Sequence, residues 1–182
     1  MNDFADDDKL VTKTLDNTAK VVVSYLLSKG ITLSTAESCT GGMVSQAITS
    51  VSGASGIYLG GVCSYNEQIK VKVLGVNETT LERFSVYSAE TASEMSLGVM
   101  KLMGSRAAVG ITGIAGPGGG TAEKPVGTVY VSVRYGQKEN VSNLMLYKNH
   151  KKLDRNTIRI ITSVKALEML KTLIEHTESE DE

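Results

Sequence analysis

The chain has 182 residues, a length that fits one domain more readily than two. Hydrophobic residues make up 41% and charged residues 21%, which is typical of a globular domain and argues against a disordered, collagen-like or membrane-spanning chain. The 19 basic and 20 acidic residues leave a net charge of −1, which argues against a protein that coats nucleic acid or anionic lipid.

Cysteine and histidine are both scarce. Cys39 and Cys63 are too few for a disulfide scaffold, and His150 and His176 are too few for a His-rich metal site. The first ten residues are acidic and contain no apolar stretch, so we expect no signal peptide. No run of 18 apolar residues occurs, so we expect no membrane-spanning helix and a cytoplasmic protein.

Helical and strand signals alternate along the first half of the chain. Apolar residues at helical spacing before Gly30 predict a helix over about 9–29, with the glycine as its stop. A short β-branched run predicts a strand over 31–36, and we expect a helix over 40–49. A second strand is expected over 57–65, followed by a short helix through Lys70.

The second half continues this alternation. An apolar stripe from Ala92 to Leu102, which Ser88 can cap, predicts a helix. The continuous apolar run 107–112 predicts a strand that is buried on both faces. Segments 127–135 and 140–147 flank a short polar loop and predict a β-hairpin, and spaced apolar residues over 161–174 predict a long last helix.

This order of elements predicts an α/β fold, as a three-layer α/β/α single domain. The sheet is expected to be mixed, because a tight hairpin forces one antiparallel pair. Residues 9–176 are expected to form the domain, between acidic ends at 1–8 and 177–182 that are expected to be flexible. In such folds, ligands bind where strands end and loops begin.

The segment STAESCTGG, residues 34–42, lies at one such strand-to-helix junction. It places Ser38, Cys39 and Thr40 in succession, and Gly41 and Gly42 after them allow close backbone approach. Free N–H groups at the start of the next helix would face a bound anion, which suits a nucleophile beside an oxyanion hole. Serine and threonine also cap helices, so these residues alone leave both interpretations open.

A glycine-rich loop follows the apolar strand 107–112. Five of the eight residues over 113–120 are glycine, a density that is costly to order and that exceeds the needs of a turn. Such a loop can direct several N–H groups at phosphate oxygens, or it can be a flexible surface connection. It matches neither GxxxxGK[ST] nor GxGxxG, so the residues exclude a P-loop ATPase and a Rossmann dinucleotide site.

The segment YNEQIKVKVLGV, residues 65–76, is typical of a strand end that leads into a short amphipathic helix. Taken alone, its Lys70 and Lys72 would be solvated charges. Neither SxxK nor GxSxG occurs in the chain, so the common serine-hydrolase signatures are absent.

Four segments in this order closely resemble the CinA C-terminal domain family in its stand-alone form. They are AESCTGG at 36–42, Tyr65…Lys70…LGV, GITGIAGPGGG at 110–120 and EKPVG at 123–127, and the likeness runs from about residue 10 to 172. The best-known activity of that family is nicotinamide-nucleotide amidase, also called nicotinamide mononucleotide deamidase. The resemblance therefore implies pyridine nucleotide salvage, in which nicotinamide mononucleotide is hydrolysed to nicotinate mononucleotide and ammonia.

The resemblance also implies roles for individual residues. Ser38 falls on the family's nucleophile, Lys70 on its base and Tyr65 on the associated tyrosine. A basic stretch near the last helix falls on Arg155 and Arg159, without indicating which of them faces the substrate. The substrate-binding residues are then expected to be Cys39, Thr40, Gly41, Gly42, Thr112, Gly113, Gly116, Gly118, Gly119, Arg155 and Arg159.

The implied chemistry uses no metal and no cofactor. Ser38 attacks the carboxamide carbon to form an acyl-enzyme, while Lys70 takes the serine proton and returns it to the departing ammonia. Because a lysine is almost wholly protonated at neutral pH, the pKa of Lys70 must be lowered by burial or by a nearby arginine. The expected partner is a small nucleotide, with no nucleic acid or membrane, and a homodimer is expected from the resemblance alone.

Two other functions remain open at this stage. A non-catalytic nucleotide-binding or interaction module could keep the phosphate loop without turnover. A hydrolase could also use Cys39 in place of Ser38, because a thiol is intrinsically the better nucleophile.

Overall fold

The computed structural model describes residues 3–149 and 153–180. Within this part the chain forms one five-stranded sheet in the order β2-β1-β3-β4-β5. Its strands are β1 (Leu33–Glu37), β2 (Tyr58–Cys63), β3 (Ala107–Gly113), β4 (Val129–Tyr135) and β5 (Lys138–Asn143). β1 pairs in parallel with β2 and β3, whereas β4 pairs antiparallel with β3 and β5, so the prediction of a mixed sheet is confirmed.

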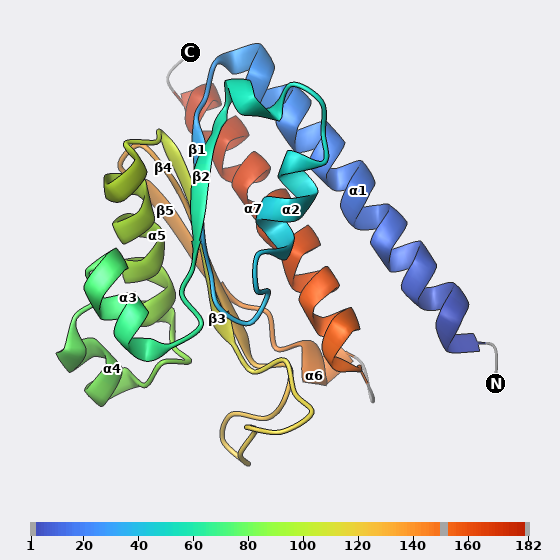
Figure 1. Ribbon diagram of the computed structural model, residues 1–182, viewed down its shortest axis with the longest axis vertical. Coiled ribbons are helices and arrows are strands. Elements are labelled where there is room, and N and C mark those ends of the chain that lie inside the picture. Colours follow the sequence, from blue (N-terminus) through green and yellow to red (C-terminus); the bar gives the residue numbers. More distant parts are fainter. Residues whose placement is uncertain (1–2, 150–152, 181–182) are drawn as a thin grey trace.

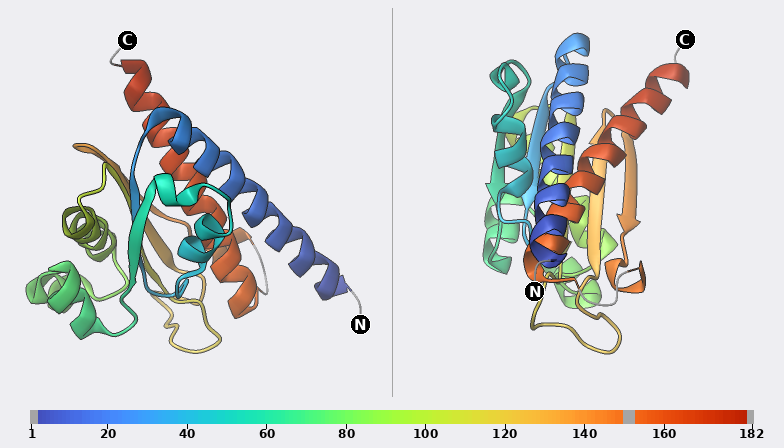
Figure 2. Two further views of the ribbon diagram at one scale, coloured as in Figure 1. Left: turned by 45° about the horizontal axis from the view of Figure 1, so that its top comes forward. Right: turned by 90° about the vertical axis from the view of Figure 1, so that its right-hand side faces the viewer.

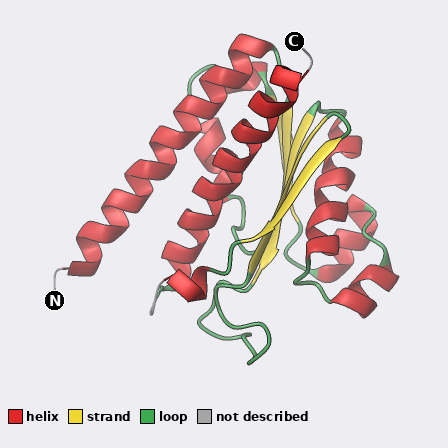
Figure 3. Cartoon of the chain, turned by 180° about the vertical axis from the view of Figure 1, so that it is seen from behind, coloured by secondary structure: helices red, strands yellow, loops and turns green. Residues whose placement is uncertain are grey.

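Helices cover both faces of this sheet, which confirms the three-layer α/β/α architecture. One face carries α1 (Asp3–Lys29), α2 (Met43–Thr49) and α7 (Arg155–Glu180), and the other carries α3 (Glu67–Leu74), α4 (Glu78–Phe84) and α5 (Ala89–Met103) (Figure 1). Seen from behind, the sheet separates these two groups along its whole length (Figure 3). The larger hydrophobic core lies under α1, α2 and α7, and a smaller one lies under α3 and α5.

β3 is buried along its full length, as its apolar run predicts. Its side chains alternate between the two cores, because successive residues of a strand point to opposite faces. Val109 and Ile111 enter the larger core, whereas Ala108 enters the smaller one. Gly110 allows α5 to approach closely, since a Cβ built there would lie 2.5 Å from the Ala92 carbonyl oxygen.

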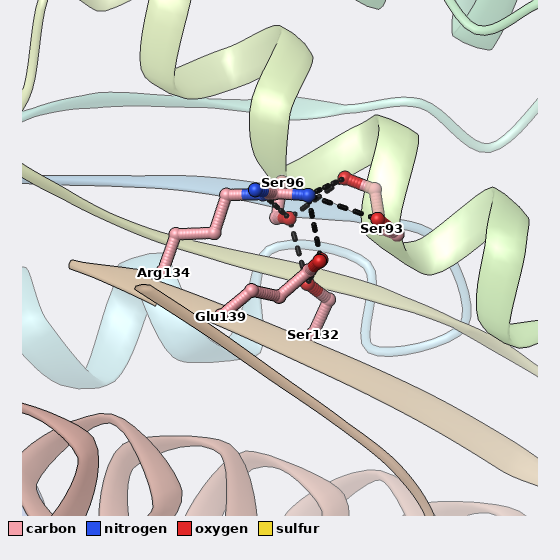
Figure 4. Close-up of polar contacts among 5 residues, drawn as sticks. All are labelled: Ser93, Ser96, Ser132, Arg134 and Glu139. Carbon is pink, nitrogen blue, oxygen red and sulfur yellow. Dashed lines mark hydrogen bonds and ion pairs between the residues drawn. The ribbon is translucent and has the colours of Figure 1, made fainter. Parts of the chain in front are cut away.

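Polar contacts also hold α5 against the sheet (Figure 4). The Arg134 side chain from β4 is 13% exposed, and its Nε donates a hydrogen bond to Ser96 Oγ on α5 at 2.9 Å. Ser96 Oγ also lies 2.7 Å from Ser132 Oγ, and Arg134 forms an ion pair with Glu139 on β5. Ser93 Oγ accepts a further hydrogen bond from the same guanidinium, so every group in this cluster has a protein partner.

Several element boundaries differ from the sequence-based expectations. α1 begins at Asp3 and α7 ends at Glu180, so helices include most of both acidic ends. The hairpin loop has only two residues, Gly136 and Gln137, and β5 ends before a short helix α6 (Leu146–Asn149), where Leu146 is buried. α4 was not predicted from the sequence, because its seven mostly polar residues form no apolar stripe. Residues 1–2, 181–182 and His150 lie outside the described residues.

The topology gathers the chemically interesting segments at one end of the sheet. β1, β2 and β3 are parallel, so their carboxyl ends meet at the same edge. Ser38 follows β1, Tyr65 follows β2, and the glycine-rich loop follows β3. This loop projects beyond the sheet close to the first turn of α7, which carries Arg155 (Figure 2).

Candidate active site

Ser38 and Lys70 form a direct contact at this end of the sheet. Ser38 is the first residue after β1, and Lys70 lies in the short helix α3, which Asn66 caps by accepting a hydrogen bond from the Gln68 N–H. Lys70 is fully buried, and its Nζ donates to Ser38 Oγ at 3.1 Å and to the backbone carbonyl oxygen of Ser64. The amine is therefore held against the hydroxyl by a second, backbone acceptor.

Burial lowers the pKa of Lys70, because a charged ammonium loses hydration in this position. The negative charge of Glu67 acts in the opposite direction and raises it. The mechanism implied by the resemblance requires the pKa of Lys70 to be lowered by burial or by a nearby arginine, and in the structure burial lowers it. A lysine of this kind is the side chain that can serve as a general base.

A pocket of about 210 Å³ opens beside this pair. Nine of the residues expected in the site line it, namely Ser38, Cys39, Tyr65, Lys70, Gly113, Gly116, Gly118, Gly119 and Arg155. The structure thus brings together the nucleophile and base expected from the resemblance, the associated tyrosine, most of the glycine-rich loop and one of the two arginines.

Arg155 bridges two walls of this pocket. Its guanidinium donates to the carbonyl oxygen of Gly116 in the glycine-rich loop and, at 2.9 Å, to Tyr65 Oη. A guanidinium carries five N–H groups, so others remain for an anion in the pocket. Tyr65 is 64% exposed and stands at the mouth of the site.

Arg159 has a different position. It does not line the pocket, and its guanidinium donates a hydrogen bond of 2.8 Å to the carbonyl oxygen of Thr40. The structure therefore distinguishes the two arginines that the sequence left equivalent. Arg155 faces the pocket, and Arg159 holds the backbone turn that follows Ser38.

Thr40, Gly41, Gly42 and Thr112 also lie outside the pocket lining, although the resemblance places them in the site. Gly41 has a φ of +61° and donates its N–H to the Ser38 carbonyl oxygen, so it shapes the turn behind the nucleophile. Thr112 Oγ1 donates to the Val86 carbonyl oxygen at 2.7 Å. These residues support the walls of the pocket from behind.

The start of α2 does not offer the free N–H groups that the sequence analysis expected. The Glu37 side chain, 1% exposed, accepts hydrogen bonds from the N–H groups of Gly42, Val44 and Ser45 and from Ser45 Oγ. The N–H of Ser38 donates to the Ile111 carbonyl oxygen. The expectation of an anion site at this helix start is therefore wrong, because a carboxylate of the chain itself occupies the donors.

Cys39 lines the pocket but is 5% exposed. Burial raises the pKa of its thiol to about 12, and the nearby Glu37 carboxylate adds to this effect. Since the thiolate and not the thiol is the nucleophilic form, Cys39 is poorly suited to attack a substrate at neutral pH. This environment favours Ser38 over the Cys39 alternative.

Five further residues line the pocket and were not predicted as site residues, namely Glu67, Val86, Tyr87, Ile114 and Ala115. Ile114 and Ala115 lie inside the loop that the glycine count singled out, so the loop as a whole was the available signal. Val86 and Tyr87 lie between α4 and α5 in a segment without any motif, and nothing in a single sequence indicates that they reach the site.

Two features are absent from the described residues. Residues 3–149 and 153–180 contain no group of three or more His, Cys, Asp or Glu side chains that could hold a metal ion. Within the same ranges, none of the helices combines the length and the apolar character needed to cross a bilayer.

Comparisons with known proteins identify similar sequences. The "CinA-like protein" of Kosmotoga olearia is 44% identical over 152 residues, which cover 84% of this chain and 36% of that protein. The "CinA-like protein" of Thermotoga maritima is 40% identical over 176 residues, covering 90% of this chain and 42% of that protein. The chain thus spans only about two fifths of the length of these curated relatives.

Solved structures match the fold over almost their whole length. The competence/damage inducible protein CihA from Agrobacterium tumefaciens superposes with a TM-score of 0.83 at 35% identity, covering 88% of this chain and 95% of that one. A CinA superfamily protein from Klebsiella pneumoniae gives a TM-score of 0.83 at 28% identity, covering 89% and 98%. A family model described as the CinA C-terminal domain matches residues 15–174. This chain belongs to the CinA C-terminal domain family.

Proposed function

We propose that the protein is an amidohydrolase that converts nicotinamide mononucleotide to nicotinate mononucleotide and ammonia. The observation that carries the proposal is the buried contact between Lys70 Nζ and Ser38 Oγ at the wall of a pocket. A lysine whose pKa is lowered by burial, placed against a serine hydroxyl, is an arrangement that activates a nucleophile. Family membership connects this arrangement with the amidase activity for which the family is best known.

In the first half of the proposed reaction, neutral Lys70 accepts the proton of Ser38 Oγ as that oxygen attacks the carboxamide carbon. The tetrahedral intermediate then breaks its C–N bond, and Lys70 returns the proton to the leaving nitrogen, which departs as ammonia. The nicotinoyl group remains on Ser38 as an ester. The carbonyl oxygen of Ser64 holds the lysine amine in place through both proton transfers.

In the second half, water attacks the ester carbonyl while Lys70 takes its proton. The bond from the acyl carbon to Ser38 Oγ breaks, the proton passes to that oxygen, and nicotinate mononucleotide is released. Lys70 and Ser38 are then in their starting states. The glycine-rich loop and Arg155 are proposed to receive the phosphate, because they bring backbone N–H groups and a guanidinium to the pocket.

An assay of ammonia release tests this function. Purified protein is incubated with nicotinamide mononucleotide, with and without EDTA, and Ser38→Ala serves as the matched inactive variant. We expect ammonia from the wild type in both conditions and none from Ser38→Ala. Loss of activity in EDTA would contradict the metal-free chemistry, and absence of ammonia in every condition would favour a nucleotide-binding module without turnover.

A further inference from the structure

Lys124 makes an unusual set of contacts beside the pocket. It belongs to the EKPVG segment at the end of the glycine-rich loop, and the proposed function gives it no role. Its Nζ donates to the carbonyl oxygen of Phe84 at 3.1 Å, to Ser85 Oγ at 2.6 Å and to the carbonyl oxygen of Tyr87 at 2.8 Å. All three donors of the ammonium thus go to oxygen atoms of one short segment, which runs from the last residue of α4 toward α5.

That segment, residues 84–87, is held in a conformation that the chain alone does not favour. Ser85 has a φ of +71°, a backbone conformation that residues other than glycine rarely adopt and that persists only when the surrounding structure holds it. Thr91 Oγ1 donates to the Ser85 carbonyl oxygen, and Thr112 Oγ1 donates to the Val86 carbonyl oxygen. Of these three side chains, which donate hydrogen bonds to the segment, Lys124 is the charged one, and it connects the segment to the end of the glycine-rich loop.

The segment held in this way is a wall of the candidate active site. Val86 and Tyr87 line the same pocket as Ser38 and Lys70. An apolar and an aromatic residue side by side suit a planar ring, whereas the phosphate is proposed to meet Arg155 and the glycine-rich loop.

The glycine-rich loop has anchors of its own that do not involve Lys124 Nζ. The Ile114 N–H donates to the Thr128 carbonyl oxygen, and the Gly127 N–H donates to the Ile114 carbonyl oxygen. Arg155 holds the Gly116 carbonyl oxygen. Removing the Lys124 ammonium therefore takes three hydrogen bonds from residues 84–87, leaves them with the bonds from Thr91 and Thr112, and leaves the loop anchored.

We propose that Lys124 is a positioning residue. It holds residues 85–87, which form a wall of the pocket, against the glycine-rich loop, and it thereby sets the affinity of the site for the ring of its substrate. This inference rests on the proposed function for the identity of that ring. Lys124 acts through Ser85 and Tyr87 and does not itself line the pocket.

Steady-state kinetics of Lys124→Met test this inference, with Lys101→Met as the control. Lys101 is an exposed lysine in the last turn of α5. Because the wall moves while the Ser38–Lys70 pair stays in place, KM for nicotinamide mononucleotide should rise roughly tenfold to a hundredfold while kcat stays within about threefold. The inhibition constant of inorganic phosphate should stay at the wild-type value, and Lys124→Arg, which keeps several donors, should recover part of the loss.

A fall in kcat with KM unchanged, or an equal loss of affinity for inorganic phosphate, would overturn the inference. The first result would place Lys124 in the chemistry, and the second would place it in the phosphate loop. If Lys124→Met does not fold, Ser85→Ala replaces it, because this change removes one of the three acceptors and should raise KM in the same direction by a smaller factor.

Hydrogen exchange provides a readout that does not depend on the substrate. Peptides covering residues 84–88 should exchange faster in Lys124→Met than in Lys101→Met, and peptides covering 114–121 should exchange at the same rate in both. A wild type that releases no ammonia would refute the proposed function. Faster exchange in Lys124→Met, confined to residues 84–88, would still support the proposed positioning role of Lys124. Unchanged exchange over 84–88 would overturn it.

Discussion

Lys70 Nζ lies 3.1 Å from Ser38 Oγ although the two residues are 32 positions apart in the chain. The contact arises because β1 and β2 are parallel neighbours, so that the segments following Glu37 and Cys63 start at the same edge of the sheet. α3 begins four residues after β2 and turns its buried face toward the end of β1. The pair thus depends on β1 and β2 lying side by side in parallel.

The first prediction separates the two neighbouring nucleophile candidates. Ser38→Ala should lose nearly all release of ammonia from nicotinamide mononucleotide, whereas Cys39→Ala and Cys39→Ser should keep most of it. The reason is that Ser38 receives the lysine contact, while burial keeps Cys39 in its thiol form with a pKa of about 12. Initial rates at saturating substrate check this, with circular dichroism to confirm that each variant is folded.

A Cys39→Ala protein that is folded and inactive would reverse this assignment. Labelling with iodoacetamide gives an independent check, since it reports thiolate reactivity. The exposed Cys63 should react much faster than the buried Cys39. Cys63→Ser therefore serves as the background in which any reaction of Cys39 is measured.

The second prediction concerns the pH dependence of turnover. Lys70 must be neutral to accept a proton, so kcat/KM should rise with pH through its pKa, which burial places below the ordinary value of 10.5. Glu67 raises that pKa by its negative charge. Glu67→Gln should therefore move the rising limb of the profile to lower pH, while Glu82→Gln, an exposed change in α4, should leave it in place. Identical profiles for the three proteins would show that Lys70 is not the titrating base.

The third prediction links Lys70 to stability. Its pKa is lower in the folded than in the unfolded chain, so between the two values the unfolded chain binds more protons. The free energy of unfolding of the wild type, measured relative to Lys70→Met, should consequently rise with pH from the lowered pKa up to about 10.5. Urea unfolding at several pH values measures this difference. If the free energy of unfolding changed with pH in the same way in both proteins, the pKa of Lys70 would not be lowered in the folded chain.

Much of the fold could be predicted because its signals are local. The run 107–112 contains only apolar or small residues, and β3 occupies Ala107–Gly113 with every residue buried. Ser88 was expected to cap the next helix, and its Oγ does accept a hydrogen bond from the Thr91 N–H. α4 was missed because it buries only Thr80 and so has no apolar stripe to detect.

The site could be predicted only where a motif marks it. Recognisable segments contain Ser38, Lys70 and Arg155. The backbone of Val86 and Tyr87, in contrast, is held at the pocket by hydrogen bonds from Thr112 and Lys124, which are distant in the sequence. The N–H groups at the start of α2 were wrongly expected to be free for an anion, because the Glu37 side chain binds them. A Glu five residues before Gly42 gives no local sign that its side chain folds back onto the helix.

The fourth prediction tests that carboxylate. Glu37→Gln should lower the free energy of unfolding by roughly 1.5–3 kcal/mol, because an amide has one acceptor oxygen and turns an NH₂ group toward the N–H donors that the carboxylate satisfies. The turn that carries Ser38 would loosen, so turnover should fall as well. Glu82→Gln is again the control, since exposed changes of this kind usually stay within about 0.5 kcal/mol. Wild-type stability of Glu37→Gln would show that the helix start needs neither the negative charge nor the second acceptor oxygen of the carboxylate.

The fifth prediction is that the phosphate, and not the base, supplies most of the substrate affinity, with Arg155 as the principal side-chain contact. Charge-assisted hydrogen bonds are each worth about 1.5–3 kcal/mol. Loss of two or three should cost roughly 3–6 kcal/mol, or about two to four decades in kcat/KM. Nicotinamide riboside, which lacks only the phosphate, should therefore be a very poor substrate.

The two arginines provide the matched pair for this test. Arg155 lines the pocket, so Arg155→Met should lower kcat/KM for the mononucleotide by about one to two decades and change that for the riboside far less. Arg159 contacts the Thr40 carbonyl oxygen outside the pocket, so Arg159→Met should affect both substrates by the same factor through the turn behind Ser38. Two results would contradict the prediction: equal effects of Arg155→Met on both substrates, or a riboside that turns over within tenfold of the mononucleotide. Either would show that the pocket does not bind the phosphate. The glycine-rich loop would then be a surface connection.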